Sequence, residues 1–240
     1  MARTRTRHVQ QDFVFRTWGG TRTGAGRKQV NATRSQPHRV RVEVRDNQAV
    51  HVTLRVAPYV RRLRRLDAYR AIRRAMRVVL ARNDFRIVHV SIQGNHVHLV
   101  LEAGSKLALA RGMQAFQISA ARRLNRVTLD DDGRPRRGPV FADRYHAEIV
   151  TTPTHARHTL SYVLNNWRKH KEDRAPYAKE WRVDKYSSAI SFAGWAEAYN
   201  WIVPADHEPL PVARPESWLL REGWKLGGGP ISIYEVPGAR

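Results

Sequence analysis

Residues 93–103 read QGNHVHLVLEA, and this stretch inserts two histidines into an otherwise apolar strand. Successive side chains of a strand point to opposite faces of the sheet, so His96 and His98 share one face. The other face carries a core stripe formed by Val97, Leu99 and Leu101. The histidine pair could be a metal-binding pair, a pH-sensitive surface pair, or two histidines satisfied within the fold.

The sequence around this strand predicts an α+β chain with alternating strands and helices. This order fits a ferredoxin-like split βαβ antiparallel sheet with helices on one face. In chain order we expect a strand hairpin at 39–56, a helix at 66–84 capped by Asp67, strands at 85–92 and 96–102, a helix at 105–126, a strand at 144–150, and a helix at 151–171 capped by Thr152.

Composition divides the chain into three parts. Residues 1–38 mix Arg, Thr, Gln and Gly without a sustained period, which predicts a flexible basic arm. Residues 39–174 hold the predicted sheet and helices and form the expected catalytic domain. Residues 175–240 are rich in Trp, Gly and Pro, and we expect them to be an appendage on that domain.

The charge of the chain points to a polyanionic partner. Lys and Arg number 43 against 21 Asp and Glu, which gives a formal net charge of +22 at pH 7. Most of the basic residues are arginines, whose guanidinium groups bind phosphate in a forked geometry and stack on bases. A GC-rich genome would also favour arginine. Nucleic acid is the natural partner for such a charge.

The chain contains no cysteine, which excludes disulfides, a thiolate nucleophile and cysteine-based zinc sites. Any metal ion must use histidine, carboxylate or amide ligands. The N-terminus lacks the apolar run of a signal peptide, and no segment reaches the ~20 apolar residues of a membrane span. We therefore expect a cytoplasmic protein that associates with the nucleoid through DNA.

The last predicted helix carries a polar group of its own. Leu160, Val163, Leu164 and Trp167 fall on one side at about 100° per residue. On the opposite side lie His158, Tyr162 and Asn166. A tyrosine and an amide at i and i+4 reach the same small volume. A metal held by the histidine pair and Asn166 would lie beside the phenol, whereas an ordinary solvated helix face would need no metal.

Several motifs together resemble the HUH single-tyrosine transposases, including those associated with repetitive extragenic palindromes (REP) in bacteria. The segments are, in this order, NHVHLVL from Asn95, LARGMQAFQISAARRLNR from Leu109, GPVFADRYH from Gly138, and SYVLNNWRKH from Ser161. The resemblance covers roughly residues 38–170. It implies cleavage and rejoining of single-stranded or hairpin DNA, by a chain that is either a homodimer or a monomer.

The resemblance also implies roles for individual residues. His96 and His98 match the metal-binding histidine pair, Tyr162 matches the nucleophile, and Asn166 matches an amide that completes a Mg²⁺ or Mn²⁺ site. The segment YVLNNW lacks the proline that many members carry after the asparagine, so the choice of Asn166 over Asn165 depends on the i+4 spacing. Arg144, His146 and His158 are candidates for DNA or proton contacts, or for structural roles.

This chemistry is coherent for the residues present. A divalent ion neutralises a phosphodiester, and attack by the phenol leaves a 5′-phosphotyrosine and a free 3′-OH, so no ATP motif is needed. Two alternatives remain at this point. One is a basic nucleic-acid-binding protein without catalysis on the same scaffold, and the other is a replication initiator or relaxase with the same histidine pair.

Overall fold

The computed structural model describes residues 43–45, 47–60, 62–179, 181–198 and 203–238. The predicted arm, residues 1–38, lies outside the described residues and stays a prediction. The described residues all belong to one compact unit. The predicted boundary at residue 174 lies within that unit and remains untested.

A four-stranded antiparallel sheet lies at the centre of the described chain, in the order β2-β3-β1-β4. The second strand of the predicted hairpin at 39–56 is formed, whereas residues 43–45 of its first strand are not in a strand. Residues 39–42 lie outside the description. The strands are β1 (Gln48–Arg55), β2 (Phe85–Ile92), β3 (His96–Ala103) and β4 (His146–Ile149).

One of the two capping residues predicted from the sequence, Thr152, is confirmed. The side-chain oxygens of Ser105 and Thr152 accept hydrogen bonds from the first turns of α2 and α3. The predicted cap Asp67 is wrong, because α1 begins one residue earlier, after Arg65, and Asp67 lies in its first turn. The α-helices are α1 (Leu66–Met76), α2 (Lys106–Val127), α3 (Pro153–Lys169) and α4 (Trp218–Arg221).

Short 3-10 helices complete the regular structure of the described residues, at Arg77–Val79, Glu172–Arg174, Pro176–Lys179, Ala189–Ser191 and Gly223–Gly227. Within the same residues, no helix combines the length and the apolar character that crossing a membrane requires.

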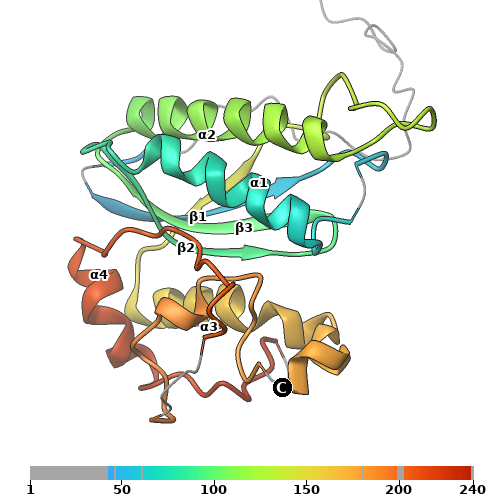
Figure 1. Cartoon of the computed structure of the whole chain (residues 1–240). Helices are drawn as coiled ribbons and strands as arrows, with labels where there is room; N and C mark the ends of the chain where they lie inside the picture. The colour runs from blue at the N-terminus through green and yellow to red at the C-terminus, as the bar shows by residue number, and fades with distance from the viewer. Residues whose placement is uncertain (1–42, 46, 61, 180, 199–202, 239–240) are drawn as a thin grey trace, which may run out of the picture. The chain divides into compact units, whose positions relative to one another are not determined.

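One face of the sheet packs under α1 and α2, as Figure 1 shows. The apolar stripe of β3 is fully buried there, as the alternation predicts. The stripe of β1 joins the same core, together with Ile72 of α1 and Phe116 of α2. The residues that these two strands contribute are Val50, Val52, Leu54, Val97, Leu99 and Leu101.

The opposite face of the sheet is covered by α3 (Figure 1). The α+β fold class and the antiparallel sheet are confirmed, but the expectation that the helices share one face needs this correction. The physical reason is a second apolar cluster, in which Val88 and Val100 of the sheet pack with Leu160 and Leu164 of α3. A second helix layer is the consequence of a sheet that carries apolar side chains on both faces.

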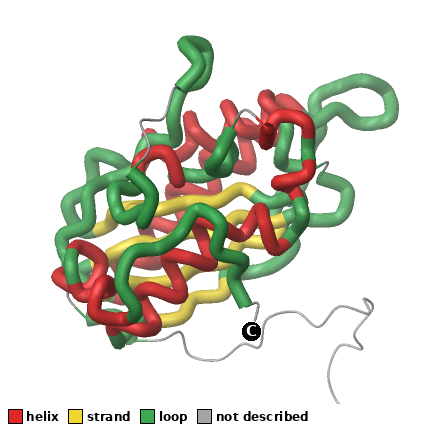
Figure 2. Tube along the Cα trace, turned by 90° about the horizontal axis from the view of Figure 1, so that it is seen from below, coloured by secondary structure: helices red, strands yellow, loops and turns green. Residues whose placement is uncertain are grey.

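The C-terminal residues pack against α3 and against the end of the sheet. Ile231 and Ile233 are fully buried in the same apolar cluster as Leu160. Glu102 of β3 is buried, and its carboxylate accepts hydrogen bonds from the backbone N–H groups of Glu216 and Ser217 at 2.9 Å. Figure 2 views this side, where loops pass over helices and strands. The C-terminal segment therefore holds α3 from its outer side.

Candidate active site

The two histidines of the opening motif lie on the sheet face that α3 covers. The ring centroids of His96 and His98 are 4.6 Å apart, and the ring of Tyr162 on α3 lies 5.1 Å from that of His98. Tyr162 is half-buried between the helix and the sheet. Residues 64 positions apart in the sequence thus form one cluster, because α3 covers the sheet face that carries both histidines.

His98 is held from one side only. Its Nδ1 atom lies 3.1 Å from the hydroxyl oxygen of Thr53 and 3.2 Å from Nε2 of His51, both on β1. The register that pairs Thr53 with His98 brings these side chains to the same face. The other ring nitrogen, Nε2, is buried and has no hydrogen-bond partner among the described residues. A buried nitrogen left unpaired is the expected state of a metal ligand.

The two adjacent asparagines of α3 differ in their hydrogen bonding. Nδ2 of Asn165 donates to the carbonyl oxygen of Ser232 at 2.9 Å, so Asn165 fastens the C-terminal segment. Asn166 is fully buried, and neither its amide nitrogen nor its oxygen has a hydrogen-bond partner within the described residues. Its side chain lies beside the phenol of Tyr162. The sequence left a choice between the two asparagines as the amide of the site. In the structure, Asn165 binds the C-terminal segment, and Asn166 lies beside Tyr162.

Burial keeps the histidines of the cluster neutral. It lowers the pKa of His98 to about 2, and the neighbouring His96 and His51 add to this effect. Burial also lowers the pKa of His51 and that of His96 to about 4. Neutral imidazole is the form that binds a metal ion. Burial raises the pKa of the Tyr162 phenol, and the Asn166 side chain opposes that increase.

Two further side chains border the cluster at the end of α3. The ammonium nitrogen of Lys169 lies 5.0 Å from the centre of the Tyr162 ring, and its charge contributes to the lowered pKa of His98. No carboxylate within the described residues forms an ion pair with Lys169. The ring of His170 lies 5.7 Å from that of His96. Lys169 therefore brings positive charge to a cluster of neutral groups.

The other candidates from the sequence lie at different distances from this cluster. His146 of β4 is exposed and pairs in register with Thr53, so it continues the same row across the sheet. Arg144 is exposed and lies two residues before the start of β4. His158 is exposed on α3, and its charge acts on Glu235 of the C-terminal segment. No ring contact within the described residues joins His158 to the histidine pair.

Sequence reasoning missed His51, Thr53, Lys169 and His170 as members of the site. The alternation of HVTLR places His51 and Thr53 on one face of β1, which is a usable signal. The register that joins this face to His98 is a long-range property, so the segment by itself could not reveal it.

The residues present fit a divalent metal ion bound by two imidazoles and an amide. Among the buried polar atoms that lack partners within the described chain, three belong to this cluster, namely Nε2 of His98 and both amide atoms of Asn166. No group of three or more His, Asp or Glu side chains in the described residues is arranged to hold a metal ion. Any such ion would therefore depend on the amide as its third protein ligand, beside His96 and His98.

Comparison with known families identifies the chain. A family model described as "Transposase IS200 like" matches residues 45–166, just over half of the chain and the whole region from β1 to Asn166. The chain therefore belongs to the family of IS200-like transposases, which act on DNA. No curated protein matches the sequence.

Two solved structures are similar to this chain at low sequence identity. One is a REP-associated tyrosine transposase bound to a REP hairpin, with 13% identity and a TM-score of 0.49, over 71% of this chain and 100% of that one. The other is a Deinococcus radiodurans R1 protein described as a transposase, with 14% identity and a TM-score of 0.36, over 59% of this chain and 98% of that one.

Proposed function

We propose that this transposase cleaves and rejoins single-stranded or hairpin DNA through a 5′-phosphotyrosine on Tyr162. The observation that carries the proposal is the convergence of Tyr162 with the unpaired Nε2 of His98 and the unpaired amide of Asn166. A protein that only binds nucleic acid gains nothing from unpaired polar groups buried beside a tyrosine, because each one costs desolvation free energy.

Tyr162 supplies the nucleophile in this proposal. Its hydroxyl oxygen forms a bond to the phosphorus while the phenol proton leaves to solvent. The bond from phosphorus to the 3′ oxygen breaks, and that oxygen takes up a proton from solvent to give a free 3′-OH. The phosphotyrosine conserves the bond energy for rejoining. His96, His98 and Asn166 would hold Mg²⁺ or Mn²⁺, which, when bound, neutralises charge on the phosphate and orients it.

The residues around this set have supporting roles. Thr53 and His51 orient His98, so that its free nitrogen points away from β1. Lys169 attracts the scissile phosphate, since it is the cation nearest the Tyr162 ring within the described contacts. The net charge of +22 supports a long DNA contact, in which Arg144, His146 and His158 remain candidates. Membership of the transposase family favours this reading over a replication initiator or relaxase.

Replacement of Tyr162 by phenylalanine tests the proposal, because it removes one oxygen and leaves packing and charge almost unchanged. The full chain is incubated with labelled single-stranded hairpin oligonucleotides and Mn²⁺, and a denaturing gel reveals any covalent adduct. We expect the wild type to form an adduct and Tyr162→Phe to form none while DNA binding persists.

Tyr59→Phe is the matched control, since Tyr59 is an exposed tyrosine that packs under Arg136. This variant should form the adduct normally. An adduct with Tyr162→Phe would refute the assignment of the nucleophile.

A further inference from the structure

An open pocket of about 410 Å³ adjoins the histidine pair on the side away from the sheet core. His96 forms part of its wall, so the pocket and the proposed metal site share a residue. Ligand pockets in proteins commonly measure about 300–1,000 Å³, which is ample for one nucleobase. The lining residues are Val60, Arg62, Gln93, Gly94, Asn95, His96, His170 and Glu172.

One wall of the pocket is the turn between β2 and β3, which backbone hydrogen bonds hold in place. The N–H of Val56 donates to the carbonyl of Asn95 at 2.9 Å, and the N–H of Leu63 donates to that of Gly94 at 2.8 Å. Oδ1 of Asn95 lies 2.7 Å from Nδ1 of His96. The turn therefore keeps its form without a ligand, and it also orients one histidine of the metal pair.

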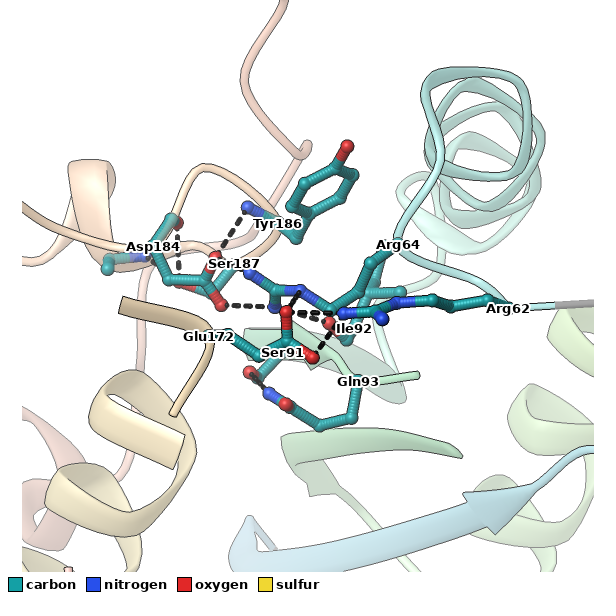
Figure 3. Close-up of polar contacts among 10 residues, drawn as sticks. Arg62, Arg64, Ser91, Ile92, Gln93, Glu172, Asp184, Tyr186 and Ser187 are labelled. Carbon is teal, nitrogen blue, oxygen red and sulfur yellow. Dashed lines mark hydrogen bonds and ion pairs between the residues drawn. The ribbon is translucent and has the colours of Figure 1, made fainter. Parts of the chain in front are cut away.

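A buried ion-pair network holds the opposite wall, as Figure 3 shows. Arg64 is buried and binds both carboxylate oxygens of Asp184, at 2.7 and 2.9 Å, while its Nε lies 3.6 Å from Glu172. Arg62 also pairs with Glu172, although the Arg62 side chain is 58% exposed. The carboxylate of Glu172 thus lies between Arg64, which is held in place by Asp184, and the half-exposed Arg62, which contacts both of its oxygens.

The polar groups of the pocket suit a neutral heterocycle better than a phosphate. Arg62 and Glu172 bring one positive and one negative charge, so the pocket has no net charge, and the carboxylate repels a phosphate. Oε1 of the buried Gln93 has no hydrogen-bond partner within the described residues. Donors and acceptors side by side match the edge of a nucleobase, which presents both.

We propose that this pocket binds one unpaired nucleobase of the DNA strand, next to the phosphate at the proposed metal site of His96 and His98. The pocket would thereby select the base at that position. The inference rests on the proposed function for the location of the phosphate. Contacts to base edges carry sequence information, whereas contacts to phosphates do not.

Gly94 offers a direct test, because its backbone conformation is an ordinary one. A Cβ added there would meet nothing closer than Cγ of Arg62 at 3.9 Å. Gly94→Leu should therefore fold and fill the pocket, and Gly94→Ala is the matched control that leaves it open. Glu172→Gln is a second variant, which keeps the shape of the pocket and exchanges one of its two acceptor oxygens for an NH₂ donor.

The measurement is base preference in binding, which does not require cleavage. Each variant is made in the full-length Tyr162→Phe chain, mixed with a pool of randomised single-stranded oligonucleotides, and the bound fraction is sequenced. We expect the parent and Gly94→Ala to prefer one base at one position by about tenfold, the size expected for one good base contact. Gly94→Leu should lose this preference at nearly unchanged total affinity, and Glu172→Gln should change the preferred base.

The outcomes separate this inference from the proposed function. If the parent shows no base preference, or if Gly94→Leu and Glu172→Gln both keep it, the pocket does not bind a base, even where the wild type forms its adduct with DNA. If the preference is lost in Gly94→Leu while the wild type forms no adduct, the base pocket stands and the proposed cleavage is wrong. Circular dichroism of each variant confirms that it is folded.

Discussion

Asn165 and Asn166 follow one another in α3, yet only Asn165 has a hydrogen-bond partner in the described structure. The pattern of the helix could predict that Tyr162 and Asn166 share a face, because an i+4 spacing is a local property. It could not predict that Asn166 would be fully buried, since that depends on the sheet beneath the helix. His51 escaped prediction for the same reason, because its role depends on strand register.

We predict that Asn166→Ala impairs adduct formation but not stability, whereas Asn165→Ala impairs stability but not the response to metal. Asn166→Ala removes one of three metal ligands, so adduct formation should fall and partly recover as Mn²⁺ is raised. Its unfolding free energy should change little, because the lost amide was buried without a partner. Asn165→Ala should lower that free energy by about 1 kcal/mol, since it removes a made hydrogen bond, and should keep the metal response.

Adduct yield against Mn²⁺ concentration and urea denaturation provide the two measurements. A fall in stability with Asn166→Ala and a normal response to Mn²⁺ would mean that Asn166 is structural. In that case the amide of the metal site would have to come from another residue.

The element that unites the site is α3, which lies between the sheet and the C-terminal segment. Sequence patterns predicted its capping residue Thr152, its N-terminal Pro153 and its buried residues Leu160 and Leu164. They did not predict which face of the sheet it would cover. Amphipathic spacing identifies the buried side of a helix, but the surface that buries it belongs to other parts of the chain.

We predict that the contacts between the C-terminal segment and α3 contribute to the free energy of unfolding. The carboxylate of Glu235 accepts hydrogen bonds from both terminal nitrogens of Arg157, at 2.8 and 3.0 Å, and from the hydroxyl of Ser161. Glu235→Ala should lower the unfolding free energy by about 1–2 kcal/mol, because the paired groups are partly buried.

Urea denaturation measures the effect, with Glu222→Ala as the matched control. Glu222 also forms an ion pair, with Lys225 at 2.7 Å, but both side chains are more than half exposed. This control should leave stability nearly unchanged. Equal changes in unfolding free energy would show that the ion pair of Glu235 with α3 stabilises the fold no more than an exposed ion pair does.

Over the whole molecule, the buried histidines couple folding to pH. Burial lowers the pKa of His89 to about 4, and His51, His96 and His98 are lowered in the same direction. These side chains stay neutral in the folded chain at a pH at which the unfolded chain binds protons. Composition alone predicts a basic protein, but it cannot tell which of the 11 histidines are buried.

We therefore predict that stability falls as the pH falls from about 6.5 toward about 4 and is flat from about pH 7 to about pH 9, below the range in which the tyrosines titrate. His89 alone should contribute on the order of 2 kcal/mol between about pH 7 and about pH 5. Urea denaturation across this range checks the slope. His89→Gln should reduce it, and the exposed His158→Gln should not. A stability that does not change with pH, or that rises in acid, would contradict the burial of these rings.

The C-terminal residues that cover the outer side of α3 are encoded far downstream of the site residues that α3 carries. A gene copy shortened after residue 174 would still encode His96, His98, Tyr162 and Asn166, and a motif search would count it as complete. Its product would lack Ile231, Ile233 and Glu235, and the helix that bears the tyrosine would lose part of its apolar cover and its ion pair. Surveys that count motif-bearing fragments in genomes would then overcount working copies of this gene.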